Sequence, residues 1–120
     1  MKFLWTTLQV RDMDKSLSFY QEIVGLKLNH RQLAGPGIEM AFLGEGDTQI
    51  ELICNKNNSK AFNGEGITIG FKVDSLEETM KIIREKGIIV TKEIFIPNPH
   101  VKFFFVNDPN SFQVQFVEQM

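Results

Sequence analysis

Ten positions in the segments predicted to be strands alternate with apolar residues, and most of them carry polar side chains. They are Trp5, Thr7, Gln9, Gln49, Glu51, Thr68, Gly70, Lys72, Gln113 and Gln115. The Glu51 carboxylate could act as a general base or anchor a ligand, Lys72 is the one cation, and Trp5, the only tryptophan, could stack on a planar ligand. A row this polar in a small domain indicates a solvated cleft that binds a small molecule.

Each of these residues also has a purely structural interpretation. Trp5 could fill a cavity instead of contacting a ligand. Glu51 could pair with Lys72 or form a hydrogen bond with Gln113 or Gln115, because a buried carboxylate without a partner is costly. For Lys72 we favour a salt bridge at the rim.

Three further reactive side chains are not expected to belong to a functional site. His100 follows a proline-containing turn and is expected at an exposed hairpin tip, and His30 is expected at the surface or in an interface. Cys54 shares its strand parity with Ile50 and Leu52, which predicts a buried, inert thiol. The sequence has no glycine-rich phosphate loop, cysteine pair or nucleophile motif.

The elements that would position these residues occur twice along the chain. Residues 4–24 and 67–86 share one plan: an alternating strand, a polar turn, an amphipathic helix and then a glycine, Gly25 or Gly87. The first helix follows an Asp12 N-cap and has apolar residues at helical spacing as far as Val24. The second follows a Ser75–Glu78 capping box.

Three strands are predicted after each helix, at about 26–33, 38–43 and 48–54 and at about 88–95, 101–106 and 112–118. The sequence therefore predicts an α+β fold made of two βαβββ modules, with residues 55–65 as a linker. One strand face should be apolar and covered by the helix, through Leu4, Leu8, Ile50, Leu52, Ile67, Ile69, Val114 and Phe116.

Length, net charge and cysteine count exclude several classes of protein. The 120 residues are enough for one domain, the net charge of -2 argues against a nucleic-acid partner, and one cysteine excludes an internal disulfide framework. No apolar run approaches the length of a membrane span, and the first residues do not resemble a signal peptide. We expect a cytoplasmic protein with no membrane or nucleic-acid partner.

The pattern is similar to the vicinal oxygen chelate superfamily, which includes glyoxalase I, extradiol dioxygenases and bleomycin- and fosfomycin-resistance proteins. The resemblance covers essentially the whole chain. It is carried by FLWTTLQVRDMDKSLSFYQEIVGLKL, QIELI, GITIGFKVDSLEETMKIIREKG and FFFVNDPNSFQVQFVE. It implies a cup-shaped curved sheet and, at this length, a homodimer.

The resemblance also implies four metal-ligand positions, which fall here on Trp5, Glu51, Thr68 and Gln115. Only Glu51 is a strong ligand. The indole N–H of Trp5 has no lone pair to offer, Thr68 supplies a neutral hydroxyl, and Gln115 supplies an uncharged carbonyl oxygen. Thr68 and Gln115 are interpreted as polar lining, and we expect no metal and no cofactor.

The sequence predicts a single glyoxalase-like domain, 1–120, made of repeats 1–54 and 66–118. The first function hypothesis is a bleomycin-resistance-like protein that binds a small molecule without a transition metal, through Trp5, Thr7, Glu51, Thr68, Lys72, Gln113 and Gln115. The second is a metal-dependent lyase or isomerase of the lactoylglutathione lyase type, with Glu51 as the candidate base. The third is a structural or partner-binding dimer with no ligand. The modules could pair within one chain or by exchange between two chains.

Overall fold

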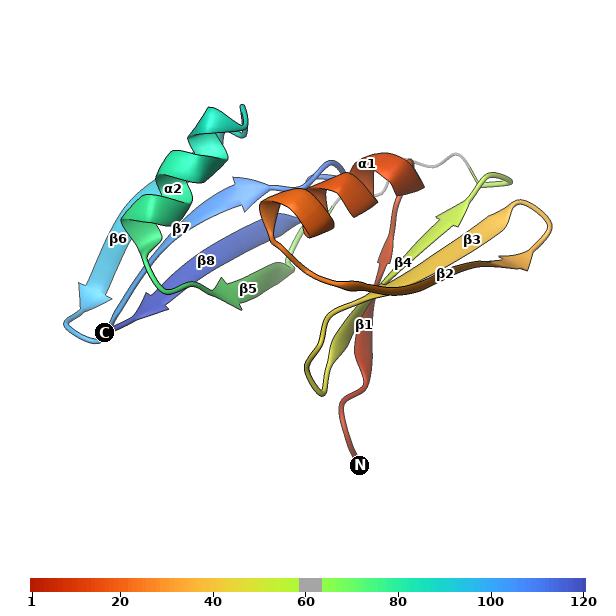
Figure 1. The fold of residues 1–120 in the computed structure, drawn as a ribbon, viewed down its shortest axis with the longest axis horizontal. Helices are drawn as coiled ribbons and strands as arrows, with labels where there is room; N and C mark the ends of the chain where they lie inside the picture. Colours follow the sequence, from red (N-terminus) through yellow and green to blue (C-terminus); the bar gives the residue numbers. More distant parts are fainter. Residues whose placement is uncertain (59–63) are drawn as a thin grey trace. The chain divides into compact units, whose positions relative to one another are not determined.

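The computed structural model describes residues 1–58 and 64–120. The chain divides into two compact units, Met1–Phe62 and Asn63–Met120, called here the N-terminal and C-terminal modules. Each module contains one four-stranded sheet (Figure 1). The predicted linker includes residues 59–63, which lie outside the described residues. That the two modules form one domain stays a prediction.

The N-terminal module has the strand order β1-β4-β3-β2. Its first and last strands are parallel neighbours, and the other neighbours are antiparallel. Its elements are β1 (Trp5–Gln9), α1 (Met13–Ser18), the π-helical η1 (Phe19–Ile23), β2 (Leu28–Gly35), β3 (Ile38–Leu43) and β4 (Gln49–Asn55).

The C-terminal module repeats this topology, with the strand order β5-β8-β7-β6. Here too the first and last strands run parallel. Its elements are β5 (Thr68–Lys72), α2 (Leu76–Glu85), β6 (Val90–Asn98), β7 (Val101–Asn107) and β8 (Gln113–Gln119). The predicted α+β fold of two βαβββ modules is therefore confirmed.

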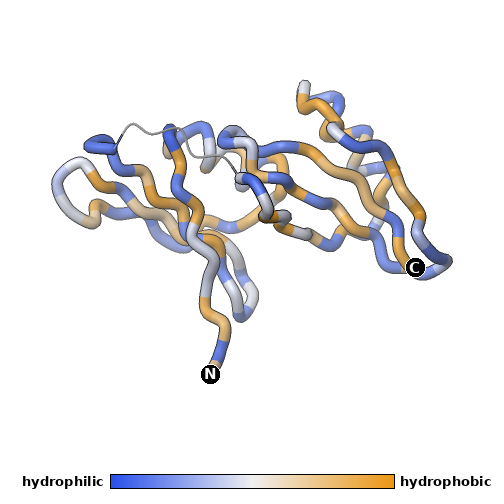
Figure 2. Tube along the Cα trace, turned by 180° about the vertical axis from the view of Figure 1, so that it is seen from behind, coloured by the Kyte–Doolittle hydropathy of each residue, from blue (hydrophilic) through white to orange (hydrophobic). Residues whose placement is uncertain are grey.

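Alternation along the strands separates two faces of each sheet, and hydrophilic and hydrophobic stretches alternate along the chain (Figure 2). One face packs on the helix of its own module. The face opposite the helix is called here the open face. The fully or nearly fully buried residues of the helix-covered layers include Leu8, Leu17, Tyr20, Ala41, Leu43, Leu52, Leu76, Ile83, Phe104, Val106, Val114 and Phe116. Burying such side chains contributes about 1.5–3 kcal/mol each.

Both helices begin as predicted. The Asp12 carboxylate accepts a hydrogen bond from the backbone N–H of Lys15 at 3.1 Å, and the Ser75 hydroxyl accepts one from the N–H of Glu78 at 3.3 Å. Gly25 and Gly87 have φ values of 84° and 80°, a left-handed conformation that favours glycine.

The first helix differs from the prediction. It is α-helical only as far as Ser18, and it continues as a π-helical turn in which the N–H of Val24 donates to the carbonyl of Phe19 at 3.2 Å. Phe19 and Tyr20 are both buried, with ring centroids 5.0 Å apart. The wider turn accommodates two adjacent large rings in the core.

Two apolar residues expected under the helices are exposed instead. Leu4 is 53% exposed and Ile67 is 46% exposed. Each lies one residue before the observed start of the strand to which the sequence alternation had assigned it. The buried face of β1 is supplied by Leu8, and on β5 Ile69 is half-buried.

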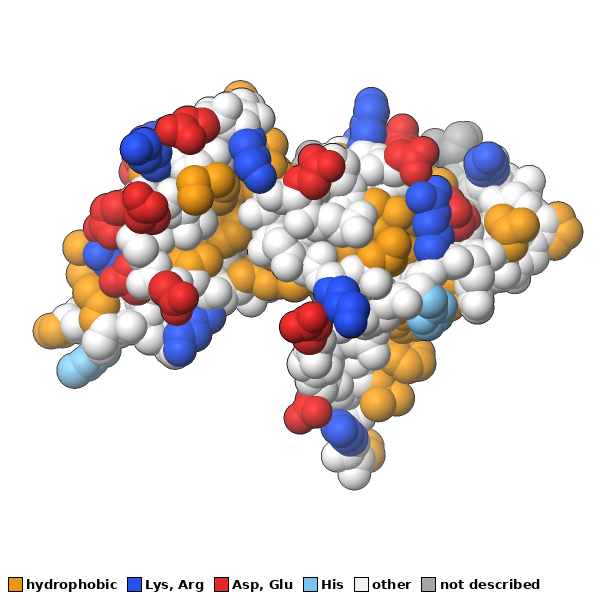
Figure 3. Space-filling model, in the orientation of Figure 1, with side chains coloured by type: hydrophobic (Ala, Val, Ile, Leu, Met, Phe, Trp, Pro, Cys, Tyr) orange, Lys and Arg blue, Asp and Glu red, His pale blue; other side chains and the backbone are white. Residues whose placement is uncertain are grey.

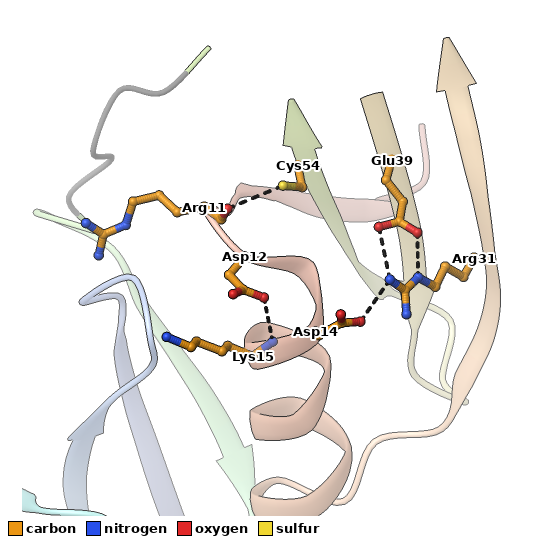
Figure 4. Close-up of polar contacts among 7 residues, drawn as sticks. All are labelled: Arg11, Asp12, Asp14, Lys15, Arg31, Glu39 and Cys54. Atoms are coloured by element: carbon orange, nitrogen blue, oxygen red, sulfur yellow. Dashed lines mark hydrogen bonds and ion pairs between the residues drawn. The ribbon is translucent and has the colours of Figure 1, made fainter. Parts of the chain in front are cut away.

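Arg31 of β2 ties the first helix to its sheet (Figure 4). Its guanidinium donates to Glu39 of β3 at 2.6 and 3.1 Å and to Asp14 of α1 at 2.9 Å. The hydrogen bond to Glu39, followed by the one to Asp14, raises the pKa of Arg31 above its ordinary value. This bidentate contact fixes the register at the edge of the sheet. No helix among the described residues is long and apolar enough to span a membrane.

Candidate functional site

The open face of the N-terminal module holds a buried carboxylate. Strand register places Thr7 beside Glu51, and Glu51 beside Phe42. The Thr7 hydroxyl donates to Oε1 of Glu51 at 2.6 Å, and Glu51 is only 6% exposed. The carboxylate therefore has a partner within its own module, one that the sequence interpretation did not name.

The Phe42 ring lies beside this carboxylate, and two further rings contact Phe42. The Trp5 ring meets Phe42 edge-on, with centroids 5.3 Å apart, and His30 stacks on Phe42 at 5.0 Å. Trp5 is 45% exposed, so the indole is open to a ligand and is not part of the helix-covered core. The predicted strand parity of Trp5 and Glu51 agrees with this arrangement.

The open face of the C-terminal module contains the other predicted site residues. The Thr68 hydroxyl donates to Oε1 of Gln113, and Gln115 lies beside Gly70. A Cβ atom at Gly70 would lie 3.4 Å from Oε1 of Gln115, so the glycine leaves that amide room to move.

Lys72, at the end of β5, is exposed. The salt bridge favoured for it from the sequence is not found among the described residues of its own module. Glu77 of α2 and Glu118 of β8 instead contact Lys102, because that side chain lies on the helix-covered face. The predicted site residues thus form two groups, one on each module.

Sequence reasoning missed the aromatic residues that surround both groups. Phe42 lies beside Glu51 and His30 stacks on Phe42, and Phe105 lies beside Gln115 with the Lys92 ammonium 5.0 Å from its ring centroid. The run of three phenylalanines at 103–105 conceals its alternation, because both faces of β7 are aromatic. Counting parity from Gln115 across the hairpin would have assigned Phe105 to the open face.

The remaining reactive side chains behave as expected. Cys54 is 8% exposed, and its thiol donates to the carbonyl of Arg11 at 3.5 Å (Figure 4). His30 and His100 are exposed. In the part of each module that the structure describes, no three side chains of His, Cys, Asp or Glu gather closely enough to hold a metal ion.

Comparison with known proteins identifies the family. The sequence matches the Glyoxalase/Bleomycin resistance protein/Dioxygenase superfamily over residues 2–116. It is 34% identical over 128 residues to a lactoylglutathione lyase of Haemophilus influenzae, a match covering 98% of this chain and 93% of that protein. It is 32% identical over 127 residues to a lactoylglutathione lyase of Neisseria meningitidis, covering 99% and 91%.

A solved structure supports the same fold. The trypanothione-dependent glyoxalase I of Leishmania major superposes with a TM-score of 0.83 at 23% identity, covering 98% of this chain and 86% of that one. The chain belongs to the Glyoxalase/Bleomycin resistance protein/Dioxygenase superfamily.

Proposed function

We propose that this chain binds a small molecule with a planar part, without a transition metal, and that Trp5 and Glu51 form part of the binding site. The observation that carries the proposal is that the half-exposed Trp5 indole and the buried Glu51 carboxylate share the open face, with Phe42 in contact with the indole and beside Glu51 in register. An exposed indole on the open face can stack on a planar ligand, while Glu51, held by Thr7, offers an oriented hydrogen-bond acceptor.

The donor atoms support the metal-free proposal. In the family pattern, Trp5 and Glu51 are the metal-ligand positions of the N-terminal module, and Thr68 and Gln115 are those of the C-terminal module. An indole N–H donates only, the Thr68 hydroxyl is engaged with Gln113, and Gln115 is uncharged. Zinc and nickel sites in proteins use imidazole, thiolate and carboxylate ligands, so this set does not fit such an ion.

A second candidate, a lyase of the lactoylglutathione lyase type, is favoured by the curated relatives of that name. It would need Glu51 as the base that removes a carbon-bound proton, and it would need a strong electrophile to stabilise the resulting enediolate. Glu51 could serve as the base, whereas the amide of Gln115 could not. We therefore rank the lyase second on the chemistry of this donor set.

Metal content and turnover distinguish the metal-free binding protein from the lyase. Protein purified without chelator and dialysed should contain well under one zinc or nickel ion per chain by elemental analysis. It should not turn over the methylglyoxal–glutathione hemithioacetal with or without added nickel. Stoichiometric tightly bound zinc or nickel, with turnover lost on chelation, would overturn the metal-free proposal and establish the lyase.

Binding itself is measured through Trp5. A library of planar small molecules is screened by thermal shift, and hits are titrated while the tryptophan emission is recorded. A true ligand should quench or shift that emission. Measured by thermal shift, which does not need the tryptophan, Trp5→Ala should weaken ligand binding by more than the matched variant Phe3→Ala, which changes an exposed ring outside β1. Homodimer formation and a cytoplasmic location remain predictions.

A further inference from the structure

The open face of the C-terminal module carries a row of phenylalanines. The rings of Phe95 and Phe103 have centroids 5.8 Å apart, and those of Phe103 and Phe105 are 5.5 Å apart. Phe95 is 59% exposed, and the other two are partly exposed. Since Phe105 pairs in register with Gln115, this aromatic row is continuous with a predicted binding residue.

On the same face, the strand residues carry positive charge and no negative charge, and Glu65, which precedes β5, lies in a pocket with Thr68 and Gln113. Lys92 lies over the face of Phe105. Lys72 pairs in register with Val117, which pairs in turn with Phe103. Among the described residues of the module, neither lysine forms an ion pair. The strand residues that share the open face include no Asp or Glu: Thr68, Gly70, Lys72, Lys92, Phe95, Asn98, Val101, Phe103, Phe105, Asn107, Gln113, Gln115, Val117 and Gln119.

The acidic side chains of this module that form ion pairs lie away from the open face. Glu77 and Glu118 contact Lys102 on the helix-covered side, and Glu93 pairs with Arg84 of α2. Acidic and basic side chains are intermixed on the surface drawn in Figure 3. Lys72 and Lys92 therefore differ from Arg84 and Lys102, which form ion pairs with acidic side chains of the same module.

From this we infer the ligand class: an aromatic anion whose ring packs on Phe103 and Phe105 and whose anionic group pairs with Lys92. The inference rests on the proposed small-molecule function and specifies its ligand. Phe105 holds the ammonium against its ring face, where an approaching anion meets a cation with no competing carboxylate. The neighbouring rings favour edge-on or offset packing of an aromatic body.

Two fluorescent probes that differ in one group test the inference. 1-Anilinonaphthalene-8-sulfonate and N-phenyl-1-naphthylamine share the same rings, and only the first carries a sulfonate. Both are titrated into the full chain, into Lys92→Met and into the matched control Lys27→Met. The control removes one exposed cation from the N-terminal module and so reports the effect of net charge alone.

We expect Lys92→Met to weaken binding of the sulfonate about tenfold and to leave the neutral probe within twofold, because a charge-assisted contact is lost while the apolar surface remains. Lys27→Met should change neither. Phe105→Leu should weaken both probes. If Lys92→Met does not fold, the wild type still tests the inference. Raising salt from 0.05 to 0.5 M should weaken its binding of the sulfonate probe and not that of the neutral probe.

Equal losses for the two probes in Lys92→Met, or a sulfonate affinity that does not respond to salt, would overturn the aromatic-anion inference. Neither outcome would affect the proposed function, which depends on metal content and on the response of Trp5. Bound zinc or nickel at one ion per chain would overturn that function instead, so the two failures are distinguishable.

Discussion

Glu51 illustrates how much of this protein's chemistry depends on one hydrogen bond. The side chain is 6% exposed, and burying a carboxylate without a partner costs several kcal/mol. Thr7 supplies the partner, since parallel pairing of β1 and β4 places the two residues side by side. The acceptor is thereby oriented on the open face before any ligand binds.

Thr7→Val should therefore destabilise the protein. Valine has nearly the same shape but no donor, so it leaves Oε1 of Glu51 without its partner, and the free energy of unfolding should fall by about 1–3 kcal/mol. The control is Thr6→Val on the same strand, whose hydroxyl makes no hydrogen bond among the described residues. Denaturant unfolding measures both. Equal effects in the two variants would mean that the Thr7–Glu51 hydrogen bond stabilises the protein no more than the half-buried Thr6 hydroxyl does.

At this scale, the sequence predicts which face a residue occupies but not which residue it contacts. Trp5 and Glu51 were assigned to one face by parity alone, because strand side chains alternate strictly. Parity does not reveal that Thr7 bonds Glu51, or that Phe42 separates Trp5 from His30. Those contacts depend on the register between strands, which the hairpin turns and the pairing of β1 with β4, 44 residues apart at Thr7 and Glu51, determine jointly.

At the scale of elements, β7 and β8 hold the start of α2. Lys102 donates to Glu77 at 2.7 Å and lies 3.5 Å from Glu118, whose other oxygen accepts the N–H of Leu76 at 2.7 Å. A carboxylate at a helix N-terminus satisfies a free donor and complements the helix dipole. The hydrogen bond from Lys102 lowers the pKa of Glu77, and the one to Glu77 raises the pKa of Lys102.

This contact predicts a pH dependence. Because the pKa of Glu77 is lower in the folded state than in the unfolded state, its contribution is fully present above the ordinary glutamate pKa. It is lost as pH falls through the folded-state value, from about pH 5 downward. Glu77→Gln should reduce the loss of Tm between pH 6 and pH 3, whereas Glu78→Gln, in the same turn without an ion pair, should change it less. A larger effect for Glu78→Gln would contradict the assignment.

The elements themselves were largely predictable, since caps and glycines have local causes. Asp12 and Ser75 cap through their side chains, and Gly25 and Gly87 adopt a left-handed backbone, so all four act within a few residues of the chain and are visible in the sequence. The π-helical turn after Ser18 was not predictable, because it depends on packing both Phe19 and Tyr20 into one core. The bulges in β6 also escape local reasoning. They shift its register against β7 between Val90 and Asn98 and distort an edge that would otherwise invite pairing.

At the scale of the whole molecule, two modules of one topology each present an open face. A module of about sixty residues is marginal alone, so each is expected to depend on pairing with another module. The family resemblance predicts that the open faces of paired modules meet around one point. Two of the four ligand positions belong to each module, so a metal ion is a direct probe of that convergence.

Rebuilding the metal site tests whether the four ligand positions converge. The triple variant Trp5→His, Thr68→His, Gln115→Glu, together with native Glu51, supplies two imidazoles and two carboxylates, a donor set that suits zinc or nickel. If the positions converge, the metal should stabilise this variant by about 2.7 kcal/mol at a concentration a hundredfold above its Kd. Adding Glu51→Gln should remove most of that gain, and the wild type should show none. A triple variant that folds but shows no metal-dependent rise in Tm would mean that the four positions do not face one ion. The pairing of Trp5 with Thr68 and of Glu51 with Gln115 across the repeats would then be wrong.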